Sequence, residues 1–273
     1  METKTPLLAA VILAGHSPQE SDPLAPYTLG RPKGLIPLGG RPMLAYVVEA
    51  LSGSRYIGSV YIVGLPPEHR LPLSTPVIHV SPQGDMVANA EAGIREAYTH
   101  NPDLEGVLVS SADIPLLTTP MVDHFIEECL KTDHDLYYGI VERSVMERRF
   151  PTSRRTYVRL TEGEFAGGDL FLVRPRAATM NTELWRRLAS ARKSPIRQAR
   201  MLGGIWPLIK LLLGRLSLEE GVQRASRALG VRGRAVICPY PEVGMDVDKP
   251  FQLEIARAEL EARVLAEHRR RPG

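Results

Sequence analysis

The 273-residue sequence predicts an α/β protein with a mostly parallel central sheet. Short apolar runs rich in Val, Ile and Leu recur along the first half of the chain, and continuous runs of this kind are typical of strands buried on both faces. Segments with the apolar spacing of amphipathic helices lie between them. Two of the runs lead into a glycine or an aspartate at the carboxyl end of the strand, where open α/β sheets bind ligands.

Length and composition exclude two classes of protein. With 44% hydrophobic and 24% charged residues the chain is too apolar for a disordered protein, and its length allows a sizeable core. No run approaches the roughly 18 apolar residues of a membrane span. We expect one domain over residues 1–273, in the cytoplasm. The apolar run after Lys4 also resembles part of a secretion signal, although about nine residues are few for one.

The cysteines and histidines give no metal-binding pattern. Cys129 and Cys238 are far apart and lack CxxC spacing, so we expect two small buried side chains and no disulfide framework. The seven histidines show no HxxxH spacing. A site for a transition metal is therefore not expected.

The chain is organised around the stretch Leu7–Leu44. Its apolar start, Leu7–Leu13, predicts a buried strand that ends before Gly15. A glycine here lets the backbone approach a ligand closely. A Pro-rich loop then leads to Arg31 and Lys33, so this first connection from strand to helix is the candidate nucleotide site.

The next elements alternate between helices and strands. Apolar residues at helical spacing predict a helix over Arg41–Ser54. The apolar runs Gly58–Leu65 and Val77–Ser81 predict strands. Asp85 is a suitable N-cap for a helix that extends to about Tyr98.

The middle of the chain contains the clearest strand and the most informative carboxylate. Gly106–Ser111 predicts a buried strand, and Asp113 follows at its carboxyl end. A buried carboxylate without a partner is costly, so we expect a cation beside it. The alternative is a simple turn that leads into the predicted helix Thr118–Leu130.

Four more strands and a closing helix complete the predicted sheet. Asp135–Glu142 is the first of these strands, and Tyr157–Leu160 with Glu164–Val173 predicts a β-hairpin. Ala235–Tyr240 predicts a last strand. A long charged helix is expected over Pro250–His268, with Pro suited to its first turn.

A basic helical insertion is predicted over residues 176–234. From Arg174 to Arg234 there are 14 Lys and Arg against 3 Glu, a net +11 that leaves 3 − 11 = −8 for the rest of the chain. The apolar segment Trp206–Leu213 suits packing within this insertion, pairing of two subunits in a homodimer, or contact with lipid headgroups; we favour packing. Without basic stripes interleaved with aromatic residues, nucleic acid is not an expected partner. The basic charge favours an anionic acceptor.

Three motifs resemble the MobA-like nucleotidyltransferases. Leu13-Ala14-Gly15 and the later P-K-x-L-x-P-x-x-G-x-P-x-L, from Pro32 to Leu44, resemble the amino-terminal signature of that superfamily. Asp113 begins a D-x-P-L-L sequence that resembles its magnesium motif, and D-V-D-x-P from Asp246 resembles its closing motif. The glycine-rich loop of the signature is replaced by His16-Ser17-Pro18. The resemblance implies a Rossmann-like, GT-A-like nucleotide-diphospho-sugar transferase fold.

The resemblance also implies roles for particular residues. The expected catalytic residues are Lys33 and Asp113. The expected Mg²⁺ ligands are Asp113, Asp246 and Asp248. The expected nucleotide-binding residues are Leu13, Ala14, Gly15, Arg31, Lys33, Gly84, Asp85 and Asn89. The expected acceptor residues are Arg154, Arg155, Gly168 and Asp169. Helix capping by Asp85, an acidic first turn at Asp246 and Asp248, and ordinary surface charge at the acceptor residues are the structural alternatives.

The expected activity is transfer of a nucleoside monophosphate from an NTP to a phosphorylated small molecule, with release of pyrophosphate and dependence on Mg²⁺. Oxygen ligands in small number suit Mg²⁺, which keeps room for phosphate oxygens and water. Two alternatives stay open. The first is a glycosyltransferase that uses a nucleotide-sugar donor, and the second is a non-catalytic relative that only binds nucleotide.

Overall fold

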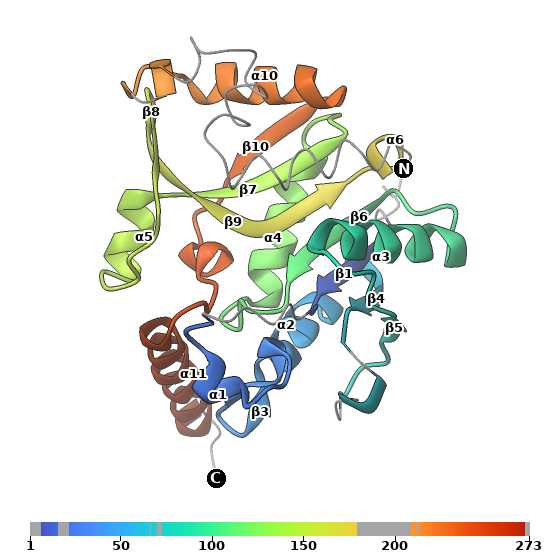
Figure 1. Cartoon of the computed structure of the whole chain (residues 1–273), viewed down its shortest axis with the longest axis vertical. Helices are drawn as coiled ribbons and strands as arrows, with labels where there is room; N and C mark the ends of the chain where they lie inside the picture. Colours follow the sequence, from blue (N-terminus) through green and yellow to red (C-terminus); the bar gives the residue numbers. More distant parts are fainter. Residues whose placement is uncertain are drawn as a thin grey trace.

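An eight-stranded sheet with helices on both faces forms the centre of the protein (Figure 1). The computed structural model of the chain describes residues 7–15, 22–65, 67–69, 73–178, 209–211 and 213–270. The strands of this sheet are β1 Leu8–Leu13, β4 Ile57–Val63, β5 Ile78–Val80, β6 Gly106–Ser111, β7 Leu136–Glu142, β8 Val158–Leu160, β9 Gly163–Val173 and β10 Gly233–Ile237. A separate hairpin pairs β2 Pro37–Leu38 with β3 Arg41–Pro42.

The strand order is β10-β7-β9-β6-β1-β4-β5, and β8 pairs with β9 outside this path. All neighbouring strands are parallel except β9, which runs antiparallel to β6, β7 and β8. In the register, Leu13 at the end of β1 pairs with Val63 of β4 and Ser111 of β6. The predicted mostly parallel sheet is thus confirmed, and the carboxyl ends of β1, β4 and β6 meet at one edge.

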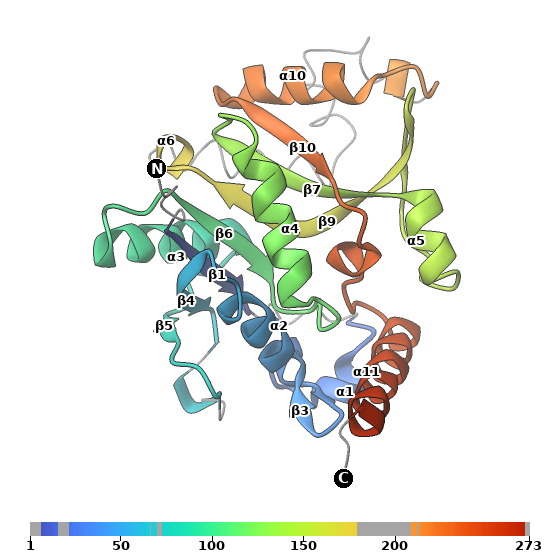
Figure 2. The ribbon, with the colours of Figure 1, turned by 180° about the vertical axis from the view of Figure 1, so that it is seen from behind.

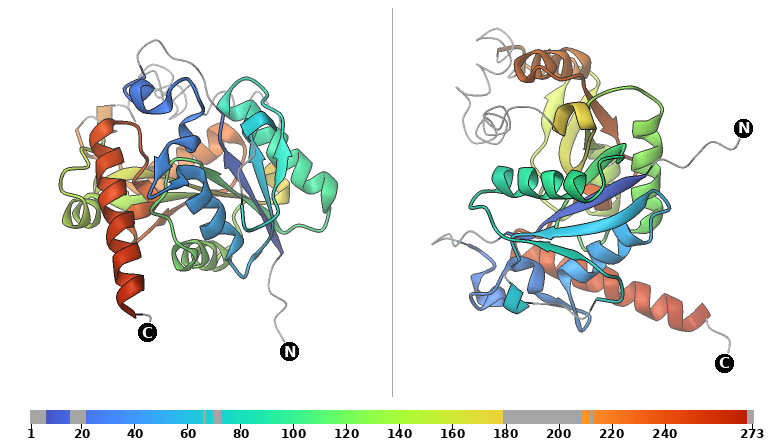
Figure 3. Two further views of the ribbon diagram at one scale, coloured as in Figure 1. Left: turned by 90° about the horizontal axis from the view of Figure 1, so that it is seen from below. Right: turned by 90° about the vertical axis from the view of Figure 1, so that its right-hand side faces the viewer.

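Helices and short turns connect the strands. They are α1 Ala25–Thr28, η1 Lys33–Leu35, α2 Met43–Ser52, η2 Pro67–His69, α3 Met86–His100, α4 Thr119–Leu130, α5 Arg143–Arg149, α6 Pro175–Ala178, α10 Leu218–Leu229, η3 Pro241–Gly244 and α11 Pro250–Arg270. Helices α2 and α4 lie on the sheet face seen in Figure 2, and α3 and α6 cover the opposite face. Helix α11 extends along one side of the molecule towards the C terminus (Figure 3).

Strand β1 is buried on both faces, as its uninterrupted apolar sequence predicts. Because side chains alternate along a strand, Leu8, Ala10 and Ile12 join the core beneath α2 and α4. Ala9 and Val11 join the second core beneath α3. This burial fixes where β1 ends and where Ala14 and Gly15 leave the sheet.

Most sequence predictions of elements agree with the structure within a few residues. The predicted helix Arg41–Ser54 begins later, at Met43, because Arg41 and Pro42 pair with β2. Helix α5 directly follows β7 and is not predicted. The position of β9 between β6 and β7 is not predicted either. Within the predicted insertion 176–234, Gly233 and Arg234 belong to the sheet as the start of β10, while residues 179–208, with Trp206, lie outside the described residues.

Two compositional expectations also have outcomes. Cys129 and Cys238 are both buried free thiols. Burial raises the pKa of the Cys238 thiol to about 12, which makes it unreactive at neutral pH. In the part of the chain that the structure describes, no helix combines the length and apolar character needed to cross a membrane.

Helix α3 packs so closely on β1 and β4 that only glycine fits at position 93. A Cβ atom at Gly93 would lie 2.6 Å from Val11 and 2.7 Å from Val63. In contrast, the nearest atom to a Cβ at Gly221, in α10, is 3.7 Å away. We predict that Gly93→Ala destabilises the fold by about 1–3 kcal/mol through overpacking. Gly221→Ala should stabilise it by up to about 1 kcal/mol, because alanine favours the helix.

Urea unfolding of both variants measures this difference. Opposite shifts of the unfolding midpoint are expected at an unchanged slope. A Gly93→Ala variant as stable as the parent chain would show that α3 does not pack on the sheet in this way.

Candidate active site

The candidate site lies beyond the carboxyl ends of β1 and β6, where three distant segments of the sequence meet. Lys33 begins η1, Asp113 follows β6, and Asp248 lies between η3 and α11. The Nζ atom of Lys33 contacts a carboxylate oxygen of Asp113 and lies 2.6 Å from Oδ1 of Asp248. One ammonium group therefore joins two carboxylates that are 135 residues apart in the chain (248 − 113).

The local sequence around Lys33 fixes the turn that carries it. Pro32 precedes the turn, and its carbonyl accepts the N–H of Leu35 at 2.9 Å. Gly34 lies against the residue before Asp113, since a Cβ here would be 3.5 Å from Cβ of Ala112. The tighter limit at position 34 comes from Leu44, whose Cβ would lie 3.3 Å from a Cβ on Gly34, so glycine eases the packing of the turn against α2.

Asp113 is held by both its side chain and its backbone. The residue is only 8% exposed, and the Ser111 hydroxyl donates to its carboxylate. Its carbonyl accepts the N–H of Val247 at 2.9 Å, which binds the closing loop to the end of β6. The N–H of Asp248 in turn donates to the side-chain oxygen of Gln252 at 3.0 Å. The two carboxylates are therefore fixed from different sides.

The electrostatics of this cluster favour a charged lysine. Burial by itself lowers the pKa of Lys33, but the adjacent charges of Asp113 and Asp248 outweigh it, and the pKa lies above its usual value. A raised lysine pKa means that the stabilisation from the charged form is complete at neutral pH. It is lost only when the pH rises through the raised pKa, in strongly alkaline solution.

Asp246, predicted as a metal ligand with Asp113 and Asp248, has a different partner. Its carboxylate forms an ion pair with Arg155, and the two side chains are only 15% and 16% exposed. No cluster of three or more His, Cys, Asp or Glu suited to a metal occurs among the described residues. Asp113 and Asp248 supply two oxygens around one point, a donor set that suits a hard cation which completes its shell with phosphate oxygens and water.

The predicted nucleotide residues at the end of β1 lie together at the same carboxyl edge of the sheet, on the side of β4. The Ala14 N–H donates to the Val63 carbonyl at 2.9 Å, so the chain leaves β1 beside β4. A Cβ atom on Gly15 would lie 2.6 Å from the amide nitrogen of Asn89. Leu13 ends the strand. The space that glycine leaves at position 15 is therefore filled by the side chain of Asn89. His16, Ser17 and Pro18 lie outside the described residues.

The start of α3 has the capped form that the sequence predicts. Asp85 accepts the N–H of Ala88 at 2.8 Å, and Gly84 before it has φ +102°. The buried side chain of Asn89 accepts the N–H of Gln83 at 2.7 Å. Asp85 and Asn89 therefore shape the loop after β5. Arg31 is exposed before η1, and its role as a phosphate ligand stays a prediction.

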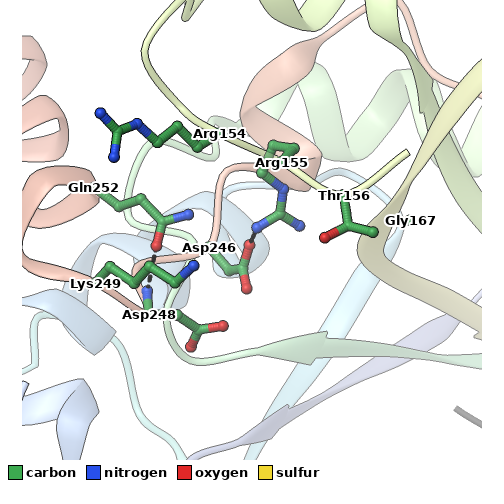
Figure 4. A pocket seen from close by; sticks show the side chains of 8 residues that line it. All are labelled: Arg154, Arg155, Thr156, Gly167, Asp246, Asp248, Lys249 and Gln252. Carbon is green, nitrogen blue, oxygen red and sulfur yellow. Dashed lines mark hydrogen bonds and ion pairs between the residues drawn. The ribbon is translucent and has the colours of Figure 1, made fainter. Parts of the chain in front are cut away.

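A polar cavity of about 280 Å³ lies on the other side of Asp248 (Figure 4). It is lined by Arg154, Arg155, Thr156, Gly167, Asp246, Asp248, Lys249 and Gln252. Two of the four predicted acceptor residues, Arg154 and Arg155, are in this lining. Gly168 is not, because it packs on β7, where a Cβ would be 2.9 Å from the carbonyl of Gly139. Asp169 does not line the cavity either.

The sequence prediction missed Lys249 and Gln252 in this lining. Lys249 is the variable position of the D-V-D-x-P segment, and Gln252 follows it by three residues, in the first turn of the helix that the pattern predicts. A basic residue next to Asp248 was the available signal, since any side chain beside a carboxylate at the sheet edge is near the ligand.

Comparison with known proteins is consistent with this geometry. A profile of the MobA-like NTP transferase domain matches residues 10–196. A solved structure described as a hypothetical transferase from Thermus thermophilus is 38% identical, with a TM-score of 0.77, over 90% of this chain and 99% of that one.

Two further similarities are more distant. A 4-diphosphocytidyl-2C-methyl-D-erythritol synthase from Anaerococcus prevotii shares the fold at 10% identity and a TM-score of 0.54, over 94% of this chain and 97% of that one. A 65-residue segment, 24% of this chain, is 38% identical to a mannose-1-phosphate guanylyltransferase regulatory subunit alpha of Drosophila melanogaster. That match spans 15% of the length of the Drosophila protein.

The contact of Lys33 with Asp113 makes a stability prediction. Lys33→Met leaves the mostly buried Asp113 without its cation, and we expect a loss of about 2 kcal/mol because an unpaired buried charge is costly. Adding Asp113→Asn to Lys33→Met should recover at least about 1 kcal/mol. A double-mutant cycle from urea unfolding measures the coupling, and strictly additive effects would contradict the observed contact.

Proposed function

The chain belongs to the family of MobA-like NTP transferase domains, and from this premise we propose that it moves a nucleoside monophosphate from an NTP to a phosphorylated small molecule. The observation that carries the proposal is the contact of Lys33 with both Asp113 and Asp248 at the carboxyl edge of the sheet. This edge is where open α/β sheets bind nucleotides. The arrangement joins one phosphate-binding cation to two carboxylates suited to a divalent metal.

The residues divide the chemistry between them. Asp113 and Asp248 would hold Mg²⁺, which, when bound, neutralises charge on the phosphates. Lys33 then pairs with a phosphate oxygen and offsets the charge that develops on the departing pyrophosphate. Transfer forms a bond between an acceptor phosphate oxygen and the α-phosphorus, and it breaks the bond from that phosphorus to the oxygen that bridges to the β-phosphate. Catalysis of this type works by positioning and charge neutralisation.

No general base is required in this scheme. A phosphate acceptor is already ionised at neutral pH, so its oxygen can attack without losing a proton. The cavity beside Asp248 supports an anionic acceptor, because Arg154, Arg155 and Lys249 line it. The acceptor would therefore occupy this cavity, next to Asp248.

A non-catalytic relative is the second candidate. The Drosophila protein that matches 65 residues of this chain carries the name of a regulatory subunit, although the matched part is 15% of its length. Binding of an NTP with Mg²⁺ but no turnover with any acceptor would favour this candidate. A glycosyltransferase would instead cleave a nucleotide-sugar and release no pyrophosphate.

A thermal-shift screen of the four NTPs with Mg²⁺ should identify the nucleotide. A ligand at 100 times its dissociation constant adds about 2.7 kcal/mol to the free energy of unfolding. We expect one NTP to raise the melting temperature clearly more than the others, and the shift to depend on Mg²⁺. Equal and metal-independent shifts for all four would oppose a nucleotide site of this design.

With that NTP, Asp113→Asn should lower the rate of pyrophosphate release by about two to four orders of magnitude. Asp103→Asn is the matched control, since Asp103 is exposed in the turn before β6 and the substitution removes the same charge. The control should retain the parent rate. Near-normal turnover of Asp113→Asn would reject the assigned role.

A further inference from the structure

The cavity beside Asp248 contains more positive charge than its own carboxylates neutralise. Its two carboxylates are already paired, Asp246 with Arg155 and Asp248 with Lys33. Its lining has two more cations, Lys249 and Arg154. Among the described residues, neither of these two forms an ion pair with a carboxylate. The cavity therefore presents positive charge without a protein counter-ion.

Lys249 is the cation that faces this cavity. Figure 4 shows its amino group directed into the space between Asp246, Asp248 and Gln252. The guanidinium of Arg154 lies towards α11, over the ring of Phe251 at 5.5 Å. Lys249 is thus placed to contact a ligand directly, with Arg154 at the rim.

A buried amide contributes a second kind of donor. Gln252 is only 3% exposed, and its side-chain oxygen accepts the N–H of Asp248 at 3.0 Å. This bond fixes the orientation of the amide and leaves its nitrogen on the cavity side (Figure 4). An NH₂ group in this place donates to a phosphate or hydroxyl oxygen.

The backbone of the opposite wall is held in an uncommon conformation. Arg154 has φ +50°, in the left-handed region that residues other than glycine seldom adopt. Such conformations concentrate at ligand sites, where the surrounding structure maintains them. Here the turn directs Arg155 towards Asp246, so the wall of the cavity is set before any ligand binds.

The lining also limits the chemical class of the ligand. The described lining residues include no aromatic and no aliphatic side chain. A flat aromatic ligand or a quaternary ammonium group would need aromatic surface, which is absent from this part of the cavity wall. At about 280 Å³ the cavity also lies just below the range of about 300–1,000 Å³ that is typical of ligand sites.

We propose that Lys249 binds the phosphate of the acceptor, with the Gln252 amide and Arg154 as further donors, and that the body of the acceptor is compact and hydroxylated. Asp246 is a positioning residue in this site, since it holds Arg155 in the wall. This inference rests on the proposed function only in identifying the bound anion as the acceptor. The anion site itself does not depend on turnover.

The test uses sn-glycerol 3-phosphate as a compact, hydroxylated probe, with the full-length chain, Mg²⁺ and a non-hydrolysable analogue of the NTP found in the thermal-shift screen. Isothermal titration should detect binding with a dissociation constant below about 10 mM. Lys249→Met should weaken it at least tenfold and Lys249→Arg less than threefold. Lys131→Met, at an exposed lysine on the end of α4, is the control and should leave it unchanged.

Each outcome has a defined meaning. Loss of probe binding in Lys249→Met, with nucleotide affinity unchanged, supports the site. No binding of the probe to the parent chain, or an equal effect of Lys249→Met and Lys131→Met, would overturn it. Phosphocholine binding as tight as that of the probe would overturn the compact, hydroxylated body. Probe binding that depends on Lys249, without pyrophosphate release from any NTP, would reject the proposed transfer and leave the anion site standing.

Discussion

The structure of the site depends on one constraint, that two carboxylates share a single ammonium group. Asp113 is nearly buried and would be costly without a cation, and Asp248 is brought to the same place by the closing loop. Lys33 satisfies both charges. The three residues come from the beginning, middle and end of the chain, so the contact depends on long-range packing and not on any one local element.

The sheet converts this constraint into a defined geometry. Strand β1 is buried on both faces, and β6 beside it carries Asp113 at its carboxyl end, where the Lys33 turn packs. A backbone hydrogen bond from Val247 to Asp113 then joins the closing loop to the same edge. Ligand-binding groups placed on rigid strand ends need little reorganisation, which favours catalysis by preorganised charge.

The sequence predicts the place of Asp113 from a local pattern, because Asp113 follows the end of a recognisable strand and parallel strands bring their carboxyl ends together. Lys33 stands 20 residues beyond β1 (33 − 13) and Asp248 stands 11 residues beyond β10 (248 − 237), so only the motifs that resemble the MobA-like family indicate their place beside Asp113. The partner of Asp246 is not predictable in this way. Asp246 lies two residues from Asp248, and only the conformation of the turn decides which group each carboxylate faces. The place of β9 between β6 and β7 is equally absent from local patterns, and with it the acceptor side of the site. Lys249 and Gln252 line a cavity only because of where β9 lies.

The central claim is that Asp113 and Asp248 surround one cation position, filled by the Lys33 ammonium until ligands arrive. Titration of Mn²⁺ without nucleotide, followed by the electron paramagnetic resonance of the free ion, tests it directly in the parent chain and in Lys33→Met. Because a metal bound as proposed would compete with the ammonium group for the same oxygens, we predict that Lys33→Met binds Mn²⁺ at least about tenfold more tightly, a difference of about 1.4 kcal/mol. Equal or weaker binding by Lys33→Met would contradict the shared cation position.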